Sequence, residues 1–187
     1  CALNSCMNFL GTHDTVRALN MFCDYNIDGT SKQDRLQIKL PEDVKSRAKE
    51  KLKLATAILY ALPGLPTIFY GDEVGLEGYE DPINRRPFPW NNMDNQLLEH
   101  YKSLGKLRAK YKKAFSGIME IFADNGLLYI MRKSADNTQN IQFIYNNSEE
   151  EKQILAKNCV NCVTNKAMDG ELSLKVGDFV VLKCKNV

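Results

Sequence analysis

Two neighbouring side chains that can carry proton and charge chemistry follow a short apolar run near the start of the chain. The run Met7–Leu10 breaks at Gly11, and His13 and Asp14 come next in "NFLGTHD". An imidazole beside a carboxylate places a hydrogen-bonding ring and a negative charge at one rim of a fold, where binding and catalytic loops commonly lie. Taken alone, this dipeptide favours a loop turn or a helix cap, because loop Asp residues commonly play both roles.

A second charged pair lies in "EDPINRR", where Asp81 and Arg85 are four residues apart and Pro82 stiffens the turn between them. A carboxylate and a planar guanidinium suit neighbouring hydroxyl groups, which both donate and accept hydrogen bonds. The alternative is an ion pair that only orders a long loop, and both roles can hold together. The sequence therefore marks Asp81 and Arg85 as candidate binding residues and leaves Arg86 outside the site.

Three further features of the same segment have structural alternatives. Asp72 and Glu73 in "GDE" are adjacent on an extended stretch, so they point to opposite sides and cannot face one bond about 5 Å apart, as a retaining pair does. We expect them to support the rim. Tyr79 and Trp90 either stack on the flat face of a ligand or plug the loop, and the sequence leaves both roles open.

The cysteines are scattered and do not resemble a disulfide framework, which predicts reduced thiols and a cytoplasmic protein. Cys159 and Cys162 form one C-x-x-C pair, but a structural zinc site needs four ligands, and His13 and His100 lie far away in sequence. We therefore predict neither a metal nor a cofactor. The six cysteines are Cys1, Cys6, Cys23, Cys159, Cys162 and Cys184.

Composition is that of an ordinary folded protein of 187 residues, with 44% hydrophobic and 26% charged residues and a net charge of +2. The interleaved charges argue against nucleic-acid and membrane partners. The longest apolar stretch, residues 55–62, is far shorter than the roughly 20 residues that cross a bilayer. The chain starts at Cys1 without a signal-peptide pattern, which we interpret as a cut within a longer polypeptide.

The first part of the chain alternates strand and helix signals. Met7–Leu10 predicts a strand, and a helical face begins near Pro41 and ends at Pro63 and Gly64. Thr67–Tyr70 predicts a parallel strand covered on both faces, and a second helix covers Leu97–Tyr111. This order is typical of a parallel α/β fold.

The pattern changes after Phe115. Strand-like runs follow one another, separated by turn residues at Asp124-Asn125-Gly126, Asp136-Asn137, Asn146-Asn147 and Asp169-Gly170. The tail is therefore predicted to be a small antiparallel β-sandwich, with five strands in "GIMEIFAD", "GLLYIMRK", "NIQFIYNN", "KQILA" and "DFVVLKC".

The motif "NFLGTHD", followed by "LYALPGLPTIFYGDEVGLEGYEDPINRRPFPW", a helix and a β tail, resembles the α-amylase family of glycoside hydrolases. The resemblance is to its neopullulanase, cyclomaltodextrinase and maltogenic amylase branch. It implies that residues 1–113 contain the last two βα units of a (β/α)8 TIM barrel, with strands seven and eight. Residues 114–187 would then form the C-terminal β-sandwich domain.

The resemblance also implies roles for the candidate residues. Asp14 matches a carboxylate that stabilises the transition state without being nucleophile or acid, and His13 matches a histidine that binds sugar hydroxyls beside the cleaved bond. Asp81 and Arg85 match residues that contact a sugar ring further away. Thr12 departs from the Asn or Ser of many relatives.

The implied activity is hydrolysis of α-1,4 or α-1,6 bonds in maltooligosaccharides, cyclodextrins, pullulan or starch. Retaining hydrolysis needs a nucleophile and a general acid, and the motifs that carry them in the family match nothing in this sequence. We therefore expect the 187-residue chain alone to be inactive, and its exposed barrel edges to favour self-association. The alternative is a non-catalytic carbohydrate-binding or interaction protein on an amylase-like scaffold.

Overall fold

The computed structural model describes residues 2–184 and divides into two compact units. The N-terminal unit comprises Met7–Leu59 and Leu65–Lys102, and the C-terminal unit comprises the remaining described residues. The C-terminal unit includes the chain from Ser103 onward. The predicted domain boundary between residues 113 and 114 stays a prediction.

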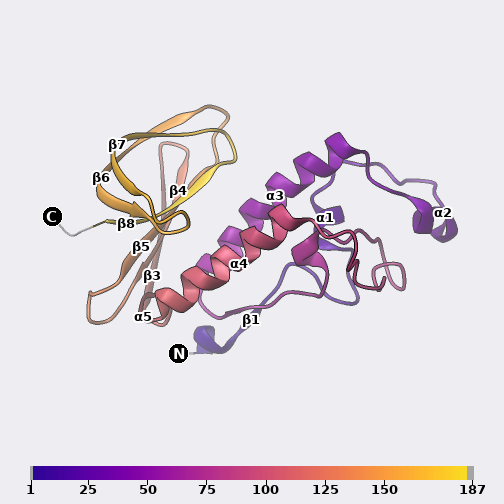
Figure 1. The fold of residues 1–187 in the computed structure, drawn as a ribbon, viewed down its shortest axis with the longest axis horizontal. Coiled ribbons are helices and arrows are strands. Elements are labelled where there is room, and N and C mark those ends of the chain that lie inside the picture. The colour runs from indigo at the N-terminus through magenta and orange to yellow at the C-terminus, as the bar shows by residue number, and fades with distance from the viewer. Residues whose placement is uncertain (1, 185–187) are drawn as a thin grey trace. The chain divides into compact units, whose positions relative to one another are not determined.

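Two short parallel strands lie in the N-terminal unit, and the first of them, β1, is labelled in Figure 1. β1 (Met7–Asn8) pairs with β2 (Leu65–Pro66), so that Met7 is opposite Leu65. The expected parallel pairing is therefore confirmed, but β1 is shorter than predicted and β2 ends just before the predicted strand Thr67–Tyr70. The other elements of this unit outside the two long helices are α1 (Ala18–Met21), α2 (Lys32–Gln37) and the 3-10 helix η2 (Asp72–Val74).

The segment predicted as a strand at Thr67–Tyr70 is irregular, because the ladder ends at Pro66. Its expected burial on both faces is also wrong for the residues described, since Ile68 and Tyr70 are 38% and 41% exposed. These two paired strands do not by themselves form a barrel.

Helix α3 (Glu42–Ala61) forms where the sequence predicts it. Ala48 and Leu52 are fully buried, whereas Ala55, expected on the same face, is half-buried. The helix ends before Pro63 and Gly64, and Gly64 has φ +98°, a value that suits glycine. The face of α3 that carries Ala48 and Leu52 is therefore buried.

Helix α4 (Asn95–Lys110) also follows its predicted apolar spacing. The aliphatic positions Leu97, Leu104 and Leu107 are at most 2% exposed. Within the N-terminal unit, Thr56 Oγ1 of α3 lies 2.8 Å from His100 Nε2 of α4, and Lys49 Nζ of α3 lies 2.5 Å from Oδ2 of Asp94, the residue before α4.

We expect the protein to have a higher unfolding free energy than a His100→Gln variant. This difference should shrink as the pH falls from about 6.5 to about 4. Burial lowers the pKa of His100 to about 4, so the folded chain keeps a neutral ring where the unfolded chain binds a proton. That advantage is complete above about pH 6.5 and is lost toward acid pH. Urea unfolding of both proteins at about pH 5 and about pH 7 measures it; an equal difference at the two pH values would contradict the expectation.

The C-terminal unit contains a six-stranded antiparallel sheet in the order β3-β4-β5-β8-β6-β7. Two short helices, η1 (Ala2–Ser5) and α5 (Lys112–Phe115), accompany it. The antiparallel arrangement confirms the prediction. The strands are β3 (Ile118–Asp124), β4 (Leu127–Lys133), β5 (Asn140–Asn146), β6 (Lys152–Asn161), β7 (Ala167–Leu174) and β8 (Phe179–Cys184).

The turn between β3 and β4 has the chemistry that the sequence predicts, because Asn125 and Gly126 have φ values of +48° and +79°. The turn predicted at Asp169-Gly170 is wrong. These residues lie inside β7, where Gly170 is opposite Ala156 of β6 and adopts φ +118° within the ladder. A glycine inside a strand can mark an irregular ladder as well as a turn.

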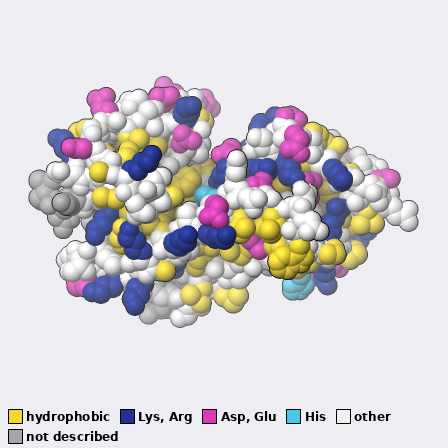
Figure 2. Space-filling model, viewed as in Figure 1, with side chains coloured by type: hydrophobic (Ala, Val, Ile, Leu, Met, Phe, Trp, Pro, Cys, Tyr) yellow, Lys and Arg dark blue, Asp and Glu magenta, His cyan; other side chains and the backbone are white. Residues whose placement is uncertain are grey.

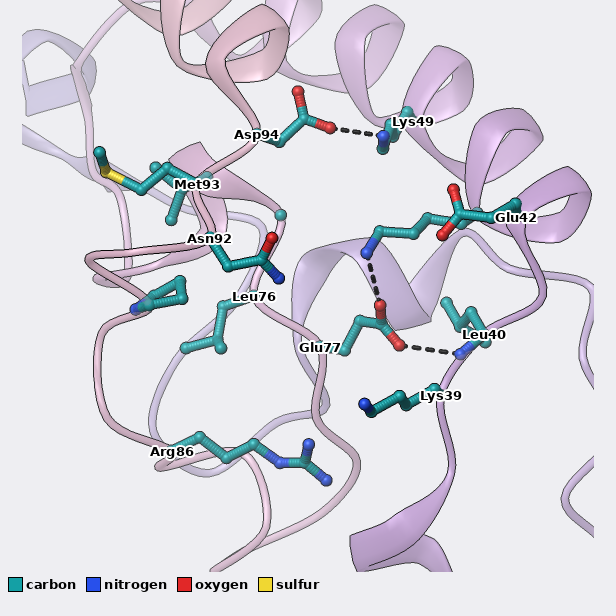
Figure 3. Close-up of a pocket in the computed structure, with 14 residues that line it drawn as sticks. Lys39, Leu40, Glu42, Lys49, Leu76, Glu77, Arg86, Asn92, Met93 and Asp94 are labelled. Carbon is teal, nitrogen blue, oxygen red and sulfur yellow. Dashed lines mark hydrogen bonds and ion pairs between the residues drawn. The ribbon is translucent and has the colours of Figure 1, made fainter.

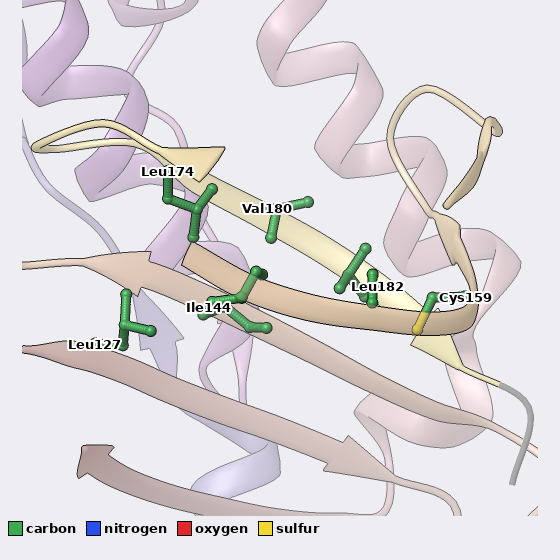
Figure 4. Packing of buried hydrophobic residues seen from close by; sticks show 8 residues of the cluster. Leu127, Ile144, Cys159, Leu174, Val180 and Leu182 are labelled. Carbon is green, nitrogen blue, oxygen red and sulfur yellow. The ribbon is translucent and has the colours of Figure 1, made fainter. Parts of the chain in front are cut away.

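The expected sandwich of two sheets is replaced by one continuous sheet, because β8 pairs with β5 on one side and β6 on the other. The sheet nevertheless encloses a core. Buried side chains from five strands pack into one cluster (Figure 4), which includes Leu127, Ile144, Ile154, Leu174 and Val180.

A disulfide joins Cys159 of β6 to Cys184 of β8, so the prediction of reduced thiols is wrong for this pair. The scattered spacing concealed it, because the two cysteines become neighbours only when β6 and β8 pair. Cys23 and Cys162 are free thiols.

Reduction of Cys159–Cys184 should lower the unfolding free energy by about 3 kcal/mol, since the bond closes a loop of 25 residues in the unfolded chain. Guanidinium unfolding with and without a thiol reductant measures the loss. The Cys159→Ser/Cys184→Ser variant is the control, and its stability should not respond to the reductant.

Acidic and basic side chains are interspersed on the surface in view (Figure 2), in keeping with the nearly balanced charge. Within residues 2–184, no helix is both long and apolar enough to cross a membrane.

Candidate active site

The loop after β1 is closed by two threonines. The Thr12 amide donates to Thr15 Oγ1 at 2.9 Å, and the Asp14 amide donates to Thr12 Oγ1 at 3.2 Å. The turn leaves the side chains of His13 and Asp14 facing solvent, 64% and 70% exposed. Hydrogen bonds therefore fix the backbone around His13 and Asp14, while both side chains are exposed to solvent.

The structure brings all four predicted site residues together. His13 Nε2 lies 3.2 Å from Asp14 Oδ2, and Arg85 Nη2 lies 3.5 Å from Asp14 Oδ1. Arg85 Nε in turn lies 2.7 Å from Asp81 Oδ1 and donates to the His13 carbonyl at 3.3 Å. Arg85 thus links the loop after β1 to the turn at Asp81, and the cluster presents two carboxylates, a guanidinium and an imidazole to solvent.

Two alternatives for these residues can now be compared with the structure. Asp14 caps no helix, because the N-cap of α1 is Arg17 and no side chain caps that end. The loop-turn interpretation fits the backbone at Thr12–Thr15. Asp81 and Arg85 do form the ion pair that the alternative requires, and Arg85 also contacts Asp14 and the His13 carbonyl, so the ion pair does not exclude a binding role.

Asp72 and Glu73 lie in the 3-10 helix η2 and not on the extended stretch that was expected, and each makes a local contact that fits a supporting role. Asp72 is 3% exposed and lies 3.3 Å from Arg17 Nη1. Burial raises the pKa of Asp72 to about 6, against the opposing effect of the Arg17 charge. Glu73 Oε2 accepts a hydrogen bond from the Gly71 amide at 2.7 Å. Neither carboxylate belongs to the exposed cluster.

The two aromatic candidates separate. Tyr79 is 5% exposed and therefore fills the loop, whereas Trp90 is 75% exposed and packs its ring against Phe88 with centroids 4.6 Å apart. An exposed indole is suited to stacking on a sugar face. Trp90 alone of this pair is available to a ligand.

A pocket of ≈ 550 Å³ lies beside α3 in the N-terminal unit (Figure 3). None of the four predicted site residues lines it. Two of its carboxylates are engaged, since Glu77 accepts from Lys45 Nζ at 2.7 Å and from the Leu40 amide at 2.9 Å, and Asp94 pairs with Lys49 at 2.5 Å. Arg86 lines the pocket and donates to the Leu36 carbonyl at 2.7 Å, consistent with its exclusion from the site.

Metal ligation has little support in the chemistry of the side chains. Among residues 2–184, no group of three or more His, Cys, Asp or Glu is arranged to hold a metal ion. In the C-x-x-C pair, Cys159 is bonded to Cys184 and cannot act as a thiolate ligand.

Arg17 and Asn84 lie directly beneath the cluster, and the sequence analysis missed both. Each is at most 1% exposed and hydrogen-bonded to the loops that carry the candidate residues. Their position next to the motifs was the available signal, because Arg17 follows Asp14 by three residues and Asn84 precedes Arg85.

Comparison with known proteins gives sequence relatives over part of the chain. An amylopullulanase of Thermoanaerobacterium thermosulfurigenes is 37% identical over 133 residues, which are 71% of this chain and 7% of that protein. A 4-alpha-glucanotransferase of Thermotoga maritima is 52% identical over 75 residues, 38% of this chain and 16% of that protein. No protein-family model matches the chain.

The fold has a matching neighbour among solved structures. The maltogenic amylase of S. marinus superposes with a TM-score of 0.70 at 30% identity, covering 93% of this chain and 22% of that one. The chain thus spans less than a quarter of each of these proteins. By sequence and by fold, it is homologous to glycoside hydrolases of the α-amylase family, whose members here include amylopullulanase, cyclomaltodextrinase, maltogenic amylase and neopullulanase.

Proposed function

We propose that this chain is the C-terminal portion of a retaining α-glucan hydrolase that acts on α-1,4 or α-1,6 glucosidic bonds. The observation that carries the proposal is the exposed cluster of His13, Asp14, Asp81 and Arg85 at the exit of β1. The parallel pairing of β1 with β2 supports their assignment as strands seven and eight of a TIM barrel, because substrate sites of such barrels lie where the strands end.

Asp14 acts as the transition-state-stabilising carboxylate. Retaining glycosidases pass through an oxocarbenium-like transition state, so a fixed negative charge interacts more strongly as positive charge develops on the sugar. His13 binds hydroxyls of the same ring. Asp81 and Arg85 bind a more distant ring through paired donors and acceptors. Trp90 adds an apolar face within reach of solvent.

The isolated chain binds α-glucan without cleaving it, since its sequence lacks the motifs for a nucleophile and a general acid. Incubation of pure protein with maltooligosaccharides or cyclodextrins should release no reducing ends, and real turnover would refute this part of the proposal.

Binding is tested by NMR titration with maltotriose. The signals of His13 and Arg85 should shift, and the shifts should vanish in Asp81→Ala but persist in Asp43→Ala, which removes an exposed carboxylate of α3. If maltotriose does not shift the wild-type signals, the α-glucan assignment is rejected. If the chain binds maltotriose but the full-length protein contains no catalytic carboxylates, the non-catalytic alternative is favoured.

Two accompanying proposals concern the molecule as a whole. Self-association through the exposed strands rests on Met7, Phe9 and Leu65, which are more than half exposed, and sedimentation at rising concentration tests it. A cytoplasmic location remains part of the proposal, although disulfides such as Cys159–Cys184 are more typical of oxidising compartments. Mass measurement of alkylated thiols in protein from its natural cells shows whether Cys159 and Cys184 are reduced, as expected in the cytoplasm, or bonded, as expected in an oxidising compartment.

A further inference from the structure

We propose that Arg17 and Asn84 are positioning residues that fix the loop carrying His13 and Asp14 against the turn carrying Asp81 and Arg85. Neither touches substrate in this scheme. The proposal deepens the proposed function, since it explains how four exposed side chains keep one geometry, but its contacts are independent of what the site binds.

Asn84 forms the direct link between the two segments. Its side chain is fully buried, and its Nδ2 donates to the carbonyls of His13 and Thr15, each at 2.7 Å. The two N–H groups of one amide therefore hold the backbone on both sides of Asp14. The next residue, Arg85, adds a longer bond to the His13 carbonyl at 3.3 Å.

Arg17 holds Asn84 from below. Its Nε donates to the Asn84 carbonyl at 2.6 Å, and its Nη1 donates to the Tyr70 carbonyl and lies 3.3 Å from Asp72 Oδ1. The guanidinium carbon also lies 4.0 Å from the centre of the Phe69 ring. A planar fork with fixed donor directions joins three segments in a way that a flexible ammonium cannot.

The backbone around this pair is shaped to let it approach. The Arg17 amide donates to the Gly78 carbonyl at 2.9 Å, and a Cβ on Gly78 would lie 2.9 Å from Asn84 Cα. A larger residue at position 78 would therefore push the Asn84 segment away from Arg17.

The network is poorly designed for stability alone. Arg17 Nη2 and Asn84 Oδ1 are buried without a hydrogen-bond partner among the described residues, and buried polar atoms of this kind cost free energy. Apolar packing at such sites is often at least as stable as buried ions. Precise placement of reacting groups, in contrast, needs buried supports, because small displacements of a site cost much of its activity.

The test uses the full chain and reads the His13 ring signals by NMR without ligand. Asn84→Ala removes both donors, and Asn84→Asp keeps the shape while setting carboxylate oxygens against the two carbonyls. In both variants we expect the His13 signals to shift and broaden while amide signals of α3 stay in place. Asn92→Ala, the same change at an exposed position of the same loop, should leave His13 unchanged.

Arg17→Lys should likewise shift and broaden the His13 signals. Arg35→Lys is its control and should leave them unchanged, because Arg35 pairs with Glu80 at 2.9 Å outside the network. Maltotriose affinity should fall about tenfold in Asn84→Ala, because the loop that carries His13 and Asp14 loses both hydrogen bonds from the Asn84 side chain. Unchanged His13 signals in a folded Asn84 variant would overturn the inference. Unfolding of both Asn84 variants would also overturn it, since the side chain would then support the whole unit. Failure of the wild type to bind maltotriose would reject the proposed function and leave the His13 result standing.

Discussion

Replacing Asp14 with Asn in a full-length enzyme that contains this segment lowers kcat about 100- to 1000-fold. The amide keeps the size of the carboxylate and removes its charge, so it no longer stabilises positive charge on the sugar ring. The loss should appear in kcat more than in KM, because the interaction strengthens in the transition state.

The measurement is steady-state hydrolysis of a maltooligosaccharide by the variant and the parent. Asp43→Asn is the matched control, since Asp43 is 70% exposed and pairs with Arg47 on α3, and its kcat should stay at the parental value. A near-normal kcat for Asp14→Asn would remove the role assigned to this carboxylate and leave the fold assignment intact.

Replacing Phe143 with Ala should lower the unfolding free energy of the chain by about 3–5 kcal/mol. Phe143 is fully buried in β5, and its ring contacts those of Phe115 and Tyr145, with centroids 6.1 and 6.3 Å away. The truncation loses apolar burial and leaves a cavity that the rigid sheet can close only in part.

Phe122→Ala in β3 is the control for this substitution. Phe122 is 47% exposed and stacks on Tyr129 with centroids 4.7 Å apart, so its loss should cost only about 1 kcal/mol. Chemical denaturation of the three proteins, read by circular dichroism, gives both values. Equal losses would contradict the assignment of Phe143 to the core.

Local signals predicted the long helices well. The spacing that buries Ala48 and Leu52 on α3, and Leu104 and Leu107 on α4, is visible in the sequence because a helix face repeats every three to four residues. Asn125-Gly126 likewise specified its turn, since few other residues adopt positive φ.

Long-range pairing was not predictable in the same way. β7 has a glycine in its middle and exposed alternate positions, so it gave no apolar run, and its place beside β6 depends on the partner strand. The Cys159–Cys184 bond follows from the pairing of β6 with β8, which no local pattern encodes. The strand at Met7 was predicted too long, and the strand predicted at Thr67–Tyr70 lies instead at Leu65–Pro66, because apolar runs do not reveal where a ladder begins or ends.

The candidate site was recognised through its exposed residues and not through its supports. His13, Asp14, Asp81 and Arg85 belong to motifs with chemical meaning, and the structure places them in one cluster. Arg17 and Asn84 act through backbone carbonyls, and a carbonyl acceptor leaves no trace in the residue type that carries it.

The longest continuous segment of the compact C-terminal unit begins at Ser103, inside α4. Leu104, Leu107 and Tyr111 are all buried and precede the first strand of the sheet. Anyone who trims the gene to express the sheet by itself should therefore start the reading frame before Ser103. A shorter chain that begins at residue 114 would lack these buried side chains of the unit's interior, and we expect it to be less stable.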